Sequence, residues 1–108
     1  MLIDFKKPIL DLKGEPMKNG ENPFLLGMAC QEALTATFQD EQALPAPEKV
    51  KRFMLALKIE GALPVDVSIE DAAEIKKLVG KAYGPLIVGR VYEIFDAASA
   101  GKPNQGEA

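Results

Sequence analysis

The sequence predicts a mainly helical α+β domain, in which about four helices follow a small N-terminal β-hairpin or strand arm. Apolar residues recur at three- and four-residue spacing in four segments between residues 24 and 98, which is the pattern of amphipathic helices. Residues 1–23 instead place short apolar stretches between Gly, Pro and Asn, which favours strands and turns. The length of 108 residues suits one domain. We therefore expect a single domain over residues 1–98 and a disordered tail over 99–108.

The β element is expected within residues 1–23. Lys13-Gly14 and Asn19-Gly20 predict tight turns, because Gly and Asn adopt positive φ angles at low cost. Pro8 and Pro16 lack an N–H donor, so they belong at strand edges or strand ends. A two-stranded hairpin is only marginally stable by itself, and we expect this one to pack on the helices.

The first helix is expected over residues 24–38, with Asn22 as its N-cap and Pro23 at its first position. Few charges interrupt its apolar stripe, so this helix should be the most buried one. The stripe includes Cys30, the one cysteine of the chain, which is accordingly interpreted as a small apolar core residue.

The second helix is expected over residues 47–60, after a polar linker at 39–47. Pro47 fits its first turn, and Gly61 fits the left-handed position that ends a helix. Four apolar residues recur at i, i+3, i+4 and i+7, a spacing that typically faces the core. They are Val50, Phe53, Met54 and Leu57.

The third helix is expected over residues 69–83, antiparallel to the second if the connection from Gly61 to Val67 stays short. Ser68 fits the N-cap, and acidic residues precede basic ones along the segment, an order that complements the helix dipole. Residues 63–67 alternate and are expected to form a short strand that pairs with the N-terminal arm. The buried face of the helix is expected to consist of Ala72, Ile75, Leu78, Val79 and Ala82.

The fourth helix is expected over residues 85–98, after a tight corner at Gly84-Pro85. Its apolar residues cover a wide arc, so the helix is either central in the core or partly faces a partner. One side presents Val88, Val91, Tyr92 and Phe95.

The composition argues against catalysis and against a cofactor. The chain has no His and one Cys, which removes the commonest general base, the commonest zinc ligand and any internal disulfide. No apolar run approaches the roughly 18 residues of a membrane-spanning helix. We therefore expect a cytoplasmic protein that is not an enzyme, binds no metal and does not associate with membranes.

One possible interaction surface lies at the corner between the third and fourth helices. Its basic residues suit a nucleic-acid interface, and its apolar residues suit a protein partner, although charged helix ends are usually only solvated and large apolar residues are usually core. Nucleic acid is disfavoured by the net charge of −3 and by the apolar character of the fourth helix. The corner comprises Lys76, Lys77, Lys81, Arg90, Leu86 and Ile87.

Over about residues 3–96 the chain resembles small proteins of tailed phages and prophages. The resemblance is carried by the opening Asp-Phe-Lys-Lys-Pro-Ile-Leu-Asp-Leu-Lys-Gly-Glu-Pro-Met and by Ala-Glu-Ile-Lys-Lys-Leu-Val-Gly-Lys-Ala-Tyr-Gly-Pro-Leu-Ile-Val-Gly-Arg-Val-Tyr-Glu-Ile-Phe. It implies a tail assembly chaperone, a non-enzymatic protein whose partner is the tape-measure or another tail protein. The resemblance does not decide whether the chain also forms a homo-oligomer. The alternatives are a structural head–tail joining component of the virion and a small nucleic-acid-binding phage regulator.

Overall fold

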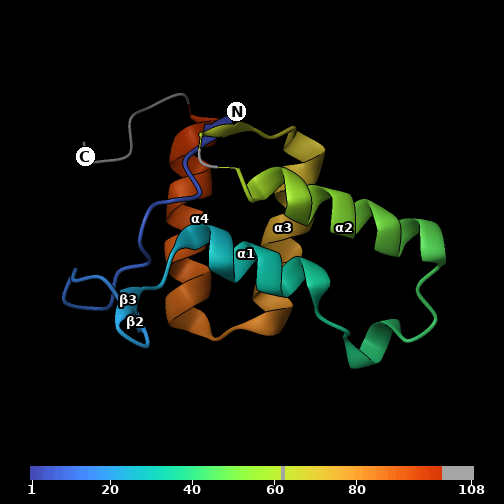
Figure 1. Cartoon of the computed structure of the whole chain (residues 1–108), viewed down its shortest axis with the longest axis horizontal. Coiled ribbons are helices and arrows are strands. Elements are labelled where there is room, and N and C mark those ends of the chain that lie inside the picture. Colours follow the sequence, from blue (N-terminus) through green and yellow to red (C-terminus); the bar gives the residue numbers. More distant parts are fainter. Residues whose placement is uncertain (62, 101–108) are drawn as a thin grey trace.

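The computed structural model describes residues 1–61 and 63–100 and confirms a mainly helical α+β fold (Figure 1). Within these residues there are four α-helices, as expected: α1 (Leu26–Thr35), α2 (Ala46–Ile59), α3 (Ile69–Ala82) and α4 (Pro85–Ser99). A 3-10 turn, η1 (Gln39–Glu41), lies between α1 and α2. The strands are short: β1 (Leu2–Ile3), β2 (Lys18–Asn19), β3 (Asn22–Pro23) and β4 (Val65–Asp66). Of the tail expected to be disordered, Ser99 belongs to α4, and residues 101–108 lie outside the described residues.

Helix α1 is the centre of the helical part, with α2 and α3 both packed against it. The two antiparallel pairs are α1 with α2 and α3 with α4 (Figure 1). The expectation that α2 and α3 lie antiparallel is wrong, because their axes cross steeply in Figure 1. The connection between them contains β4, which pairs with β1. This pairing redirects the chain before α3 begins, so α3 does not return along α2.

The N-terminal arm contains the expected hairpin and turns. β2 pairs antiparallel with β3, and Gly20 in the intervening turn has a φ angle of +70°. Gly14 has a φ angle of +86°, in the other predicted turn. β1 pairs antiparallel with β4, as expected for the strand at residues 63–67. The arm packs on the helices through Ile3, Phe5 and Ile9, which are fully buried.

Helix α1 is shorter than expected and begins without a side-chain cap. Asn22 and Pro23 belong to β3 and are therefore neither the N-cap nor the first helical residue. The N-terminal arm supplies the acceptors instead: the N–H groups of Leu26 and Gly27 donate to the carbonyl oxygens of Lys7 and Phe5, at 2.7 and 2.8 Å. Pairing with a distant backbone segment thus replaces the local cap that a helix start usually needs.

Two further details at the helix ends and faces differ from expectation. Gly61 does not have a positive φ angle; α2 ends at Ile59, where the N–H of Glu60 donates to Leu57 and tightens the last turn. Ala82 is exposed, whereas the other four residues of the expected buried face of α3 are buried. The cap of α3 is confirmed, because Ser68 Oγ accepts the Asp71 N–H at 3.0 Å.

Two helical glycines provide a matched stability test. A Cβ atom at Gly27 would lie 3.0 Å from the carbonyl oxygen of Phe5, whereas one at Gly80 would meet nothing within 4 Å. We expect Gly27→Ala to lower the free energy of unfolding by about 1–3 kcal/mol, because it pushes the N-terminal arm off α1. Gly80→Ala should raise it by about 0.5–1 kcal/mol through helix propensity. Urea unfolding of both variants checks this, and equal effects would contradict the close packing at Gly27.

Candidate protein-binding surface

One face of α2 carries four large apolar side chains that point into solvent. Their exposed fractions lie between 53% and 57%, so the expectation that this spacing faces the core is wrong. We call this set the apolar stripe: Val50, Phe53, Met54 and Leu57. The face of α2 that is buried is the opposite one, with Arg52, Leu55, Ala56 and Ile59.

Polar contacts help to decide which face of α2 turns inward. The side-chain amide of Gln31 on α1 donates to the carbonyl oxygen of Ala56 at 3.0 Å and to Glu60 Oε1 at 2.7 Å. Arg52, on the same inner face, reaches carboxylates on η1 and α3. Turning α2 over to bury the apolar stripe would break these bonds and leave Arg52 without partners. Helix α2 is therefore apolar on two opposite faces. The hydrogen bonds of Gln31 and the ion pairs of Arg52 favour burial of the face with Leu55, Ala56 and Ile59.

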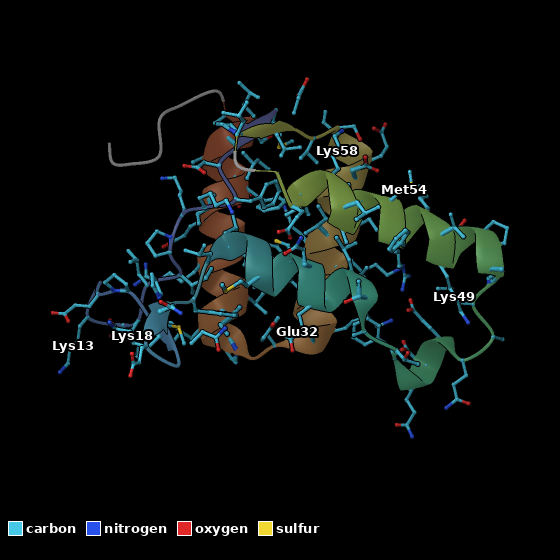
Figure 2. All side chains as sticks on the ribbon, viewed as in Figure 1. Lys13, Lys18, Glu32, Lys49, Met54 and Lys58 are labelled. Atoms are coloured by element: carbon cyan, nitrogen blue, oxygen red, sulfur yellow. The ribbon has the colours of Figure 1, made fainter. Side chains whose placement is uncertain are left out.

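Lysines border the apolar stripe on both sides. Figure 2 shows Met54 and Lys58 on the edge of α2 that points away from α1, and Lys49 on the edge toward η1. Lys51 and Lys58 line a shallow hollow at one edge of the stripe, together with Asp71 at the start of α3. The exposed apolar surface thus has a basic border, and Asp71 adds one acidic group to it.

A pocket of about 310 Å³ opens at one end of the apolar stripe. It lies between the end of α1, the connection through η1 and the first turns of α2. Phe53 belongs both to its lining and to the stripe, so the pocket and the stripe are continuous. Charged lining comes from Glu41, Lys49 and Arg52. The large apolar lining residues are Leu34, Phe38, Leu44 and Phe53.

Two lining residues of this pocket, Glu41 and Arg52, belong to an ion-pair cluster. The guanidinium of Arg52 donates to both carboxylate oxygens of Glu41, at 2.7 and 3.0 Å, and through Nε to Glu74 at 3.1 Å. Lys81 Nζ lies 3.0 Å from both Asp40 and Glu41. These charge-assisted bonds tie η1 to α2 and α3, and they fix the geometry of this part of the pocket lining.

The cluster changes the proton affinity of its members. Hydrogen bonds from Arg52 and then Lys81 lower the pKa of Glu41 from 4.5 to about 2. The hydrogen bond to Glu41 raises the pKa of Arg52. Burial works against the charge of Lys81, but hydrogen bonds to Glu41 and Asp40 outweigh it, so its pKa is also raised. All three groups are therefore fully ionised at neutral pH.

Acid should weaken the fold through Glu41. Because its pKa is lower in the folded chain, its ion pairs stabilise the fold fully above about pH 4.5, and this stabilisation is lost as the pH falls toward 2. Glu41→Gln should therefore be less stable than the parent at pH 7 and lose less stability between these two pH values. Thermal unfolding across the range checks this, with Glu21→Gln in the exposed β2–β3 turn as control. Identical pH profiles for parent and Glu41→Gln would contradict it.

Three of the four cations singled out at the α3–α4 corner already pair within the chain. Lys76 lies 3.1 Å from Asp96 and over the ring of Tyr92, and Lys81 belongs to the cluster with Glu41. Arg90 donates to the carbonyl oxygens of Leu10 and Asp11, at 3.1 and 2.7 Å, and to Glu93 at 3.1 Å. Lys77 is exposed. The apolar residues of the corner, Leu86 and Ile87, are both half-buried, and Ile87 packs against the core.

Two side chains that could act as nucleophiles, Cys30 and Tyr83, stay protonated at neutral pH. Burial raises the pKa of the Cys30 thiol to about 12, and the side chain is fully enclosed in the core, as expected for a core residue. Burial and then a hydrogen bond to Glu32 raise the pKa of Tyr83, which stays protonated. Across residues 1–61 and 63–100, no group of three His, Cys, Asp or Glu side chains is placed to hold a metal ion.

The spacing of the apolar stripe predicts a core-facing row and gives no sign of an exposed surface. The signal that was present is a second apolar row on the same helix, formed by Leu55, Ala56 and Ile59.

Every helix within the described residues is too short or too polar to span a membrane. In comparisons with protein-family models, curated proteins and solved structures, no match to this chain was found.

Proposed function

We propose that this chain is a non-enzymatic binding protein of phage tail morphogenesis, which covers apolar helical segments of another polypeptide. One observation carries the proposal: the apolar stripe on α2, with four large side chains each more than half exposed. A contiguous exposed apolar face on a folded helix marks a surface for a partner. The resemblance to small tailed-phage proteins supplies the partner, the tape-measure protein.

The geometry suits reversible binding of a helix. The apolar stripe spans two turns of α2, about 10 Å, and a partner helix laid along it would bury apolar side chains on both sides. A contact of this size is weak by itself. Many copies bound along one long helical chain would cover it, and each copy could leave as the tail tube encloses that chain.

Co-expression with the tape-measure protein of the same phage genome tests this function. The chain should co-purify with it and keep it soluble, and mass spectrometry of purified virions should not find the chain. Stoichiometric presence in virions would instead support the structural head–tail role. A tape-measure protein that does not co-purify would contradict the chaperone role. The basic corner supports no second function here, because three of its four cations are already paired.

A further inference from the structure

The charge of α2 is opposite to that of the whole chain. Helix α2 contains four basic residues and one acidic residue, whereas the chain has a net charge of −3. Arg52 is neutralised by Glu41 and Glu74. The three lysines of the helix, Lys49, Lys51 and Lys58, are exposed. In the part of the chain that the structure describes, none of these lysines forms an ion pair.

We propose that the occupant of the apolar stripe is an amphipathic helix with acidic residues along both edges of its apolar face. This inference rests on the proposed function and specifies the partner's chemistry. When a helix covers the stripe, its edge residues come to lie beside Lys49 on one side and beside Lys51 and Lys58 on the other. Carboxylates at those positions form favourable charge pairs, whereas lysines there are repelled. The basic border therefore selects the partner and fixes its register.

The same charges argue against a second copy of this chain as the occupant. If two α2 helices packed antiparallel about a two-fold axis, each edge would face its own equivalent in the other copy. The edge with Lys51, Lys58 and Asp71 would then meet two lysines and one carboxylate of the partner copy, so the two facing edges would both be net positive. Like charges that face each other destabilise an interface, so an acidic helix is favoured over self-association.

An anionic membrane surface fits less well than a polypeptide. A lysine-bordered apolar stripe is also typical of helices that lie on membranes. Here, however, the stripe is only about 10 Å long, and the rest of the chain is acidic. The stripe also leads into the 310 Å³ pocket at Phe53, a discrete concave site that suits one bulky apolar side chain of a partner.

Two synthetic helical peptides of about 20 residues test the proposal, a length at which isolated helices form. Both carry Leu and Phe at i, i+3, i+4 and i+7; one has Glu at the edge positions and the other has Lys. We expect the Glu peptide to bind about 10-fold more tightly at low salt, since each exposed charge pair contributes about two- to three-fold. Ionic strength of about 1 M should remove the difference.

Charge reversal on α2 should invert this preference. The double variant Lys51→Glu/Lys58→Glu should bind the Lys peptide more tightly than the Glu peptide. The matched control is Lys13→Glu/Lys18→Glu, which changes the net charge equally at the other end of the molecule (Figure 2) and should keep the preference of the parent. Circular dichroism of all variants verifies that the helices are retained.

The remaining outcomes separate this inference from the proposed function. Equal binding of the two peptides, lost in Leu57→Asp, would overturn the charge preference while the stripe remains the binding surface. Failure of both peptides to bind would also overturn it. Failure of the tape-measure protein to co-purify contradicts the proposed function independently of either peptide. Binding to phosphatidylserine vesicles that is lost in Lys51→Glu/Lys58→Glu would assign the stripe to membranes, and a dimer that Leu57→Asp dissociates would assign it to a second copy.

Discussion

Replacing Leu57 with aspartate is expected to abolish co-purification of the tape-measure protein and to leave the fold intact. Leu57 lies in the apolar stripe and is 53% exposed, so the free chain loses little packing when it is replaced. Exposed substitutions of this kind usually change the free energy of unfolding by no more than about 0.5 kcal/mol. In the complex, by contrast, the carboxylate would be buried against an apolar helix. We expect the affinity to fall at least about 30-fold, as for central interface residues.

The matched control for this variant is Leu12→Asp. Leu12 is 86% exposed and lies on the N-terminal arm, outside the apolar stripe. The Leu12→Asp variant introduces the same charge at another exposed leucine, so it should co-purify with the tape-measure protein as well as the parent does. Thermal unfolding should place both variants close to the parent. If Leu57→Asp and Leu12→Asp retain the tape-measure protein equally well, the apolar stripe is not its binding surface.

The sequence predicts local features of this fold well. The turns at Gly14 and Gly20, the cap at Ser68 and the helix start at Pro85 depend on neighbouring residues, and all are present. Helix α1 begins at Leu26 and not at residue 24 as expected, because the acceptors for its first N–H groups are the carbonyls of Phe5 and Lys7, about twenty residues earlier in the chain. A pattern of neighbouring residues contains no information about such a contact.

The orientation of α2 could not be derived from periodicity for a similar reason. Two opposite faces of this helix are apolar, and the spacing identifies both but does not tell which one is buried. That choice depends on Arg52, whose partners Glu41 and Glu74 lie 11 and 22 residues away on other elements. Because a basic residue is usually exposed, nothing in the local pattern indicates that Arg52 lies on the inner face and the larger apolar residues on the outer one. The candidate binding surface therefore became visible only when the ion pairs were known.

Phe95→Ala is expected to be among the most destabilising single substitutions in the chain. Phe95 is 1% exposed and is the largest fully buried side chain among residues 1–61 and 63–100. Its removal should lower the free energy of unfolding by about 3–5 kcal/mol, the usual effect of deleting a buried aromatic ring. Small domains are stable by only about 5–15 kcal/mol, so the variant should be close to unfolding. Urea unfolding at 25 °C measures the loss, and a loss no larger than that of Tyr92→Ala, at a 37% exposed site on the same helix, would contradict it.

The reason for this large effect is that Phe95 joins two parts of the molecule. Its ring lies 6.1 Å from that of Phe5, edge to face at 76°, and so connects α4 to the N-terminal arm. The same segment of the arm supplies the carbonyl that caps α1. In a double-mutant cycle, Phe5→Ala and Phe95→Ala should therefore be coupled by about 0.5–1.5 kcal/mol. Strictly additive losses would mean that the two rings contribute independently, and that their contact does not couple α4 to the N-terminal arm.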